Sequence, residues 1–272
     1  AYELQKVSSG SLNGLAATSC LAASADATLI GGDTTTGHET LLTVANPGKV
    51  DANVRVIAYG PAGRLGGQTL TNLRVSASTA QVVSLNGLIP DAPTFSLRVL
   101  ADGPGVASFM QARTLYGTKA SGVDWIQSSP SKPATKLTIP GLLVRGGTKF
   151  SDMRMVLRIS NATGRTASVT AQVFGEGANT FGTVLTGTVG AESTIDLPIT
   201  GIKDGDFSAL VTSNRAVSAS VQLLRIKGSA APAVDFAWLP AIPEISTGSV
   251  LTPSSGIAKV SFVNQGSSPA VI

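Results

Sequence analysis

The sequence predicts an all-β protein with two tandem immunoglobulin-like or fibronectin-like antiparallel β-sandwiches, followed by the start of a third repeat. The segment LTVANPG at 42–48 returns as LRISNAT at 157–163 and begins again as VSFVNQG at 260–266. A repeat of domain length indicates tandem domains rather than a solenoid. Short segments rich in β-branched and aromatic residues fill each repeat, and no stretch has a long helical period with caps.

The expected strands follow one another in the same order in both repeats. Alternating or β-branched runs end at turn residues such as Gly60, Gly175 and Pro198, as strands of a sandwich do. The run Val123-Asp124-Trp125 is matched with Val234-Asp235-Phe236. The predicted strands are 40–45, 54–59, 80–85, 95–100 and 106–115 in the first repeat, and 169–174, 193–197, 207–212 and 217–226 in the second.

The boundaries of the repeats follow from the proline-rich stretches between them. Pro130 and Pro133 stand among small polar residues, a composition typical of a semi-rigid extended spacer. A third unit of two or three strands is too small to bury a face alone. We expect an N-terminal segment at 1–38, sandwiches at 39–127 and 141–238, a linker at 128–140, and a linker with a partial third repeat at 239–272.

The composition favours an exported protein. Only 13% of the residues are charged, and no run of apolar residues is long enough to span a membrane. The formal charge of +4 is spread along the chain, which disfavours nucleic-acid binding. Cys20 is the only cysteine, so it is a buried apolar residue, an intermolecular bridge or a lipid attachment site. Whether a signal peptide or an anchor precedes Ala1 stays open.

The sequence contains no motif that predicts catalysis, a cofactor or a metal. Asp33, His38 and Glu39 lie close together, but adjacent turn residues rarely converge on one ion, and no second histidine exists. We interpret them as a polar loop. A divergent hydrolase that uses these three residues is the weakest of three functional hypotheses.

The candidate contacts with a ligand or partner are the aromatic and acidic residues near the ends of the two repeats. They are Trp125, Asp124, Trp238 and Asp235. Aromatic rings at a cleft can stack on sugars, whereas packing of one domain on the next is the simpler interpretation. The recurrence of the aspartates in both repeats indicates a shared structural role. Function is expected where the copies differ: at 1–38, at 60–72 and at the junctions.

The repeat also resembles a known kind of protein. The pattern at 43–48 followed by ANVRVIAYG at 52–60, together with GVDW at 122–125 and TIPGL at 138–142, resembles an uncharacterised family of secreted actinobacterial cell-envelope proteins. In that family, such L-x-L-x-N-P-G repeats mark β-sandwich modules. The resemblance implies export and modular sandwiches, and it supplies no catalytic residues.

We therefore expect a non-enzymatic, extracytoplasmic module of the cell envelope. Its expected partner is an envelope protein, membrane-embedded or not, or a cell-wall glycopolymer, with no nucleic acid and no cofactor. The alternative is a carbohydrate-binding module that uses aromatic residues at the domain junctions. The sequence does not give the identity of the partner or the oligomeric state.

Overall fold

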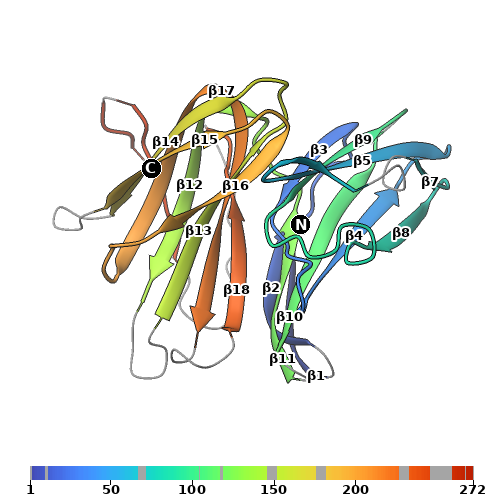
Figure 1. Cartoon of the computed structure of the whole chain (residues 1–272), viewed down its shortest axis with the longest axis horizontal. Coiled ribbons are helices and arrows are strands. Elements are labelled where there is room, and N and C mark those ends of the chain that lie inside the picture. Colours follow the sequence, from blue (N-terminus) through green and yellow to red (C-terminus); the bar gives the residue numbers. More distant parts are fainter. Residues whose placement is uncertain are drawn as a thin grey trace.

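The strands of the protein pack as two units side by side (Figure 1). The structure, a computed structural model, has no helix among the residues it describes, so it holds none that could cross a membrane. The all-β, antiparallel prediction is confirmed. The described residues are 2–9, 12–66, 72–103, 105–116, 119–145, 152–175, 182–226, 233–245, 259–266 and 268–271.

The first unit contains two sheets around one core. One sheet has the order β11-β10-β4-β8, and the other has the order β3-β9-β5-β6 with β7 also paired to β5. Apolar side chains that alternate along these strands fill the space between the sheets. The bounds are β3 Asp26–Ile30, β4 His38–Asn46, β5 Ala52–Gly60, β6 Gly63–Leu65, β7 Leu73–Val75, β8 Thr79–Ser84, β9 Ser96–Ala101, β10 Ala107–Tyr116 and β11 Lys119–Gln127.

The second unit repeats this arrangement around one long strand, β17 (Gly205–Ile226). The first half of β17 pairs with β12 and β14, and its second half pairs with β13 and β18. The single strand β17 therefore takes the places that two separate strands, β9 and β10, occupy in the first unit. The other bounds are β12 Ala134–Val144, β13 Asp152–Asn161, β14 Ala167–Gly175, β15 Thr183–Val189, β16 Ser193–Ile199 and β18 Ala233–Pro240.

Strand for strand, the two units have the same order. The sheet β12-β17-β14-β15 corresponds to β3-β9-β5 with β6 and β7, and the strands β18, β17, β13 and β16 correspond to β11, β10, β4 and β8. Each unit has its own buried apolar cluster. The structure is thus compatible with the predicted pair of tandem sandwiches.

The strand bounds place two boundaries differently from the prediction. β3 lies within 1–38, the predicted N-terminal segment outside the first sandwich, yet it completes a sheet of that sandwich. β12 begins at Ala134, inside the predicted linker 128–140, which leaves a spacer of 128–133. The remaining N-terminal residues form a hairpin of β1 (Tyr2–Ser9) and β2 (Leu12–Ser19).

One asparagine turn occurs three times among the residues that the structure describes. Asn46, Asn161 and Asn264 each accept a hydrogen bond from the backbone amide two residues later and donate one to the carbonyl four residues later. Asn46 and Asn161 are buried, and each also donates a hydrogen bond to the carbonyl of a valine on another strand, Val75 and Val189 respectively. Asn264 is exposed. The described residues around Asn264 therefore contain a third copy of this turn. The rest of the predicted third repeat, at 246–258, lies outside the described residues.

We expect Asn161→Ala to lower the free energy of unfolding by about 2–3 kcal/mol, because it leaves buried carbonyl groups without a donor. Chemical denaturation followed by circular dichroism measures the change. The matched control is Asn264→Ala, where water can replace the lost bond, and its effect should stay within about 0.5 kcal/mol. Equal effects of the two substitutions would contradict this account.

Candidate functional site

The junction between the sandwiches is organised around one buried arginine. Arg158 on β13 is only 2% exposed and projects from the second sandwich toward the first. Its guanidinium makes five hydrogen bonds, the number of N–H donors that the group carries. The acceptors are both carboxylate oxygens of Asp196, at 2.7 and 2.8 Å, and the carbonyls of Gly32, Phe95 and Pro93 at 2.7, 3.2 and 2.7 Å.

These contacts explain how an arginine can be buried here. Burying an ion is costly unless its charge is paired and its donors are satisfied. Asp196 is the partner directly opposite Arg158 in the sheet, and it also accepts a hydrogen bond from the hydroxyl of Thr94 at 2.7 Å. The three carbonyl acceptors belong to the first sandwich. Asp196 pairs the charge of Arg158 within one sandwich, but all the N–H donors of Arg158 find protein acceptors only when the two sandwiches are docked.

A second polar cluster continues the junction. The hydroxyl of Ser96 in the first sandwich lies 2.7 Å from that of Ser160 and 2.8 Å from that of Thr194, and all three residues are buried. Hydroxyl groups can both donate and accept, so such a cluster satisfies itself without water. Paired hydroxyls hold the two surfaces in one register.

Trp238 on β18 provides the apolar part of the junction. It is 6% exposed, belongs to the core of the first sandwich, and has the guanidinium carbon of Arg158 at 4.6 Å from its ring centroid. Gly31, at φ +147°, lies under the ring, and a Cβ there would come within 2.9 Å of it. A side chain at that position would push the tryptophan out of the interface.

Two carboxylates lie at the same junction. Asp124 is 4% exposed and accepts a hydrogen bond of 2.7 Å from the backbone amide of Trp238. Asp235 accepts one of 2.9 Å from the backbone amide of Leu15 on β2, and another from the amide of Val123. Burial raises the pKa of both carboxyl groups, that of Asp124 to about 8. Each carboxylate thus joins strands of different units.

The two aspartates do not occupy equivalent places, contrary to the sequence match. In the sheets, Gln111 lies opposite Trp125 and Gln222 lies opposite Trp238, so the two tryptophans are the structural counterparts. The sequence match instead pairs Trp125 with Phe236. The hairpin between β17 and β18 is longer than that between β10 and β11, which displaces the returning strand by two residues.

Trp125 is half-buried on the outer face of its sheet. Its ring lies 5.8 Å from that of Phe109, and its Nε1 is buried and has no hydrogen-bond partner among the described residues. The structure thus brings Asp124, Asp235 and Trp238 together inside the junction and leaves Trp125 partly accessible beside it. Contact of these four residues with a ligand or partner stays a prediction.

The acidic and histidine residues of the weakest hypothesis serve local structure. Asp33 accepts hydrogen bonds from the amide and the hydroxyl of Thr35, and that hydroxyl lies 3.1 Å from Nδ1 of His38. Glu39 instead forms an ion pair with Arg113. Within the described part of the chain, no three His, Cys, Asp or Glu side chains are grouped as for a metal. Cys20 is free and exposed.

Arg158 and Asp196 are assigned no role in the sequence analysis, although a comparison of the two repeats contains a signal for them. Their counterparts in the first repeat, by strand register, are Thr43 and Val82, which lie opposite each other on an accessible face. Only the second repeat has a pair of opposite charges at these two cross-strand positions. This difference indicates that the face of the second repeat that carries the pair is the one that docks.

Comparisons with known proteins add a family and weak structural similarities. The model of a family described as "Family of unknown function (DUF5719)" matches residues 1–272. No curated protein matches the chain. The crystal structure of Thermotoga maritima 1070 has a TM-score of 0.34 and 16% identity, covering 42% of this chain and 97% of that one.

Two carbohydrate-active enzymes are also similar over part of their length. The exo-chitosanase CsxA of Amycolatopsis orientalis has a TM-score of 0.21 and 11% identity, covering 79% of this chain and 24% of the enzyme. A calcium-binding mutant of β-glucuronidase 2 from Bacteroides uniformis has a TM-score of 0.17 and 12% identity, covering 80% of this chain and 26% of that one. Similarities this weak carry no argument about activity.

Removing the junction arginine should destabilise the protein and uncouple the sandwiches. We expect Arg158→Met to cost about 3–5 kcal/mol, because Asp196 and three carbonyls lose their donors. Urea denaturation should show the lower stability, with the single transition becoming two. Arg165→Met, at an exposed arginine of the same sandwich, is the control and should behave as wild type. An unchanged single transition in Arg158→Met would refute the coupling.

The buried carboxyl of Asp124 should make the stability fall as the pH rises. Its folded pKa of about 8 lies above the ordinary value of 3.8, so the folded protein holds the proton more tightly than the unfolded chain. The contribution is complete below pH 3.8 and is lost as the pH rises to about 8. We expect Asp124→Asn, which cannot ionise, to flatten the dependence of unfolding free energy on pH. Asp235→Asn, at the less buried carboxyl, should flatten it less.

Proposed function

The chain belongs to the DUF5719 family, whose function is unknown, and we propose that it is a non-enzymatic binding module of the cell envelope. In this proposal the two sandwiches act as one rigid body that holds an envelope protein or a glycopolymer. The supporting observation is the junction, where Arg158 satisfies all its donors only across the interface. A junction of this kind fixes the spacing of surfaces on both sandwiches, which lowers the entropic cost of binding a partner that contacts both.

The use of the acidic side chains also supports a binding role. Asp124 and Asp235 accept backbone amides, Asp33 caps a turn, and Glu39 and Asp196 are paired with arginines. Carboxylates engaged in this way serve the fold rather than acid–base chemistry. The location outside the cytoplasm is supported by the low charged fraction of 13%.

A carbohydrate-binding module is the second candidate function. The pair of Phe109 and Trp125, with ring centroids 5.8 Å apart on the outer face of the four-stranded sheet, favours it. Half-exposed rings on a sheet face can stack against sugar rings. Trp125→Ala should then abolish binding on a glycan array, while circular dichroism shows that the variant remains folded.

The binding proposal is tested by sedimentation with isolated envelope from the producing organism. We expect saturable co-sedimentation of the purified chain, without release of sugars or peptides. Arg158→Met, which loosens the junction, should weaken this binding about tenfold by restoring the entropic cost of ordering two bodies. Arg165→Met is again the control. Absence of saturable binding, or release of a hydrolysis product, would refute the proposal.

The proposed location is tested separately. Cell fractionation of the producing organism should recover the native protein with the envelope or the medium. External protease should digest it in intact cells, while a cytoplasmic marker stays protected. Recovery with the cytoplasmic marker would contradict export.

A further inference from the structure

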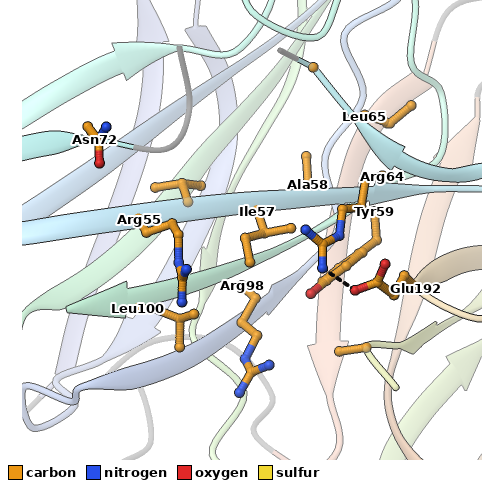
Figure 2. A pocket seen from close by; sticks show the side chains of 13 residues that line it. Arg55, Ile57, Ala58, Tyr59, Arg64, Leu65, Asn72, Arg98, Leu100 and Glu192 are labelled. Carbon is orange, nitrogen blue, oxygen red and sulfur yellow. Dashed lines mark hydrogen bonds and ion pairs between the residues drawn. The ribbon is translucent and has the colours of Figure 1, made fainter. Parts of the chain in front are cut away.

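A groove runs over the outer face of the five-stranded sheet of the first sandwich. It has a volume of about 760 Å³, and its floor is made by side chains of β5 and β9. Arg55, Ile57 and Tyr59 come from β5, and Arg98 and Leu100 come from β9. Figure 2 shows Arg55 and Arg98 projecting from neighbouring strands to the same side of the sheet.

The second sandwich provides the far wall of this groove. Ala162 and Glu192 line it, and Glu192 forms an ion pair with Arg64 of β6 that joins the two sandwiches (Figure 2). The groove adjoins a second hollow of about 700 Å³, which shares Tyr59, Arg98 and Ala162 with it. The accessible lining of this hollow includes Ser24, Thr28, Ser128, Ser129, Ser131 and Thr163, whereas Ser160 and Ser218 beside them are buried.

The cations of the groove differ in how they are held. Arg98 makes a two-pronged ion pair with Asp26, with Nε–Oδ1 and Nη2–Oδ2 distances of 3.0 and 2.6 Å. Arg55 is exposed and makes no ion pair or hydrogen bond with the part of the chain that the structure describes. Glu192 of the groove is paired with Arg64, and Asp26 of the adjoining hollow is paired with Arg98, so Arg55 is the groove arginine that neither acid neutralises.

The strand register sets the spacing of the two floor arginines. Arg55 lies opposite Leu100, and Ile57 lies opposite Arg98. Arg55 and Arg98 are thus diagonal neighbours on one face, at a spacing of about 7–8 Å or somewhat less between their Cβ atoms. Two guanidinium groups at this spacing can hold one anionic group between them or two anionic groups of successive units in a chain.

The second repeat shows that the fold does not require these charges. In the equivalent strands, Thr170 replaces Arg55 and Leu210 replaces Arg98, while the buried positions beside them remain apolar. Both sandwiches form the same sheet with and without the arginines. The cationic floor is therefore a property of one copy and is additional to the scaffold.

We propose that this groove binds an anionic glycan, a sugar chain that carries carboxylate or phosphate groups. Arg55 pairs with an anionic group of the glycan, and Arg98, held by Asp26, presents its charge beside it. The hydroxyls of Thr28 and Ser128, in the adjoining hollow, exchange hydrogen bonds with sugar hydroxyls. This site deepens the proposed binding function, on which it rests, by naming the place and the chemistry of contact.

The backbone around the groove favours a glycan over an acidic peptide. Extended peptides gain affinity by adding a strand to a free sheet edge. On the edge strand β3, the carbonyl of Thr28 already accepts a hydrogen bond of 2.7 Å from the amide of Ser129 in the spacer. The groove therefore presents side chains rather than free backbone hydrogen-bonding groups. Such a surface suits a ligand that is recognised by its charges and hydroxyls.

Titration calorimetry with an oligogalacturonate, a neutral malto-oligosaccharide of the same length and polyglutamate tests the site. We expect the full chain to bind the oligogalacturonate alone, more weakly as salt rises. Arg55→Gln should lower the affinity about tenfold or more, because a charge-assisted contact is lost from an exposed position. Lys203→Gln removes the same charge from an exposed loop outside the groove and should leave the affinity unchanged.

Three results would overturn the inference. They are equal binding by Arg55→Gln and wild type, equal binding of the neutral sugar, and binding of polyglutamate as tight as that of the oligogalacturonate. A phosphate-bearing glycan in the same assay, with inorganic phosphate as competitor, distinguishes the two anionic groups. If the oligogalacturonate and the phosphate glycan both fail to bind while envelope co-sedimentation persists, this site is refuted and the proposed function remains.

Discussion

The burial of Arg158 is the constraint on which the relation of the two sandwiches depends. A guanidinium removed from water must find an acceptor for each of its donors, and here three of the five hydrogen bonds go to carbonyls of the other sandwich. Neither sandwich alone can supply the complete set. The ring of Trp238 over the guanidinium and the hydroxyls around Ser96 then fit only in that orientation. The groove beside the junction owes its far wall to the same docking.

The copies share a scaffold and differ in what their outer faces carry. Thr43 in the first repeat stands where Arg158 stands in the second, and Arg55 stands where the second has Thr170. These exchanges leave the inward side chains apolar, so the sheets form in both copies. One arginine lies on a face that is buried against the other copy, and another lies on a face that remains open. Duplication has thus given one fold two different surfaces.

The sequence was sufficient for the fold class because alternation along strands such as β14 records burial directly. The same reasoning could not locate β3, because its five residues are too few to show a clear alternation. It also could not detect the longer hairpin before β18, so Asp124 and Asp235 were matched although the sheet places two tryptophans in register. The junction depends on which outer sheet face of one sandwich packs against the other sandwich. Alternation along a strand separates inward from outward side chains but does not show which outward face is covered. A difference between the copies, such as Thr43 against Arg158, was the only signal.

The unbroken strand β17 has a mechanical consequence. It pairs along its length with β12, β14, β13 and β18, so tension along it is shared by both sheets of the second sandwich at once. In the first sandwich the equivalent path is interrupted after Ala101, and β9 and β10 belong to different sheets. Under load the two halves are therefore unequal: the first can yield one sheet at a time, whereas the second resists as a single element.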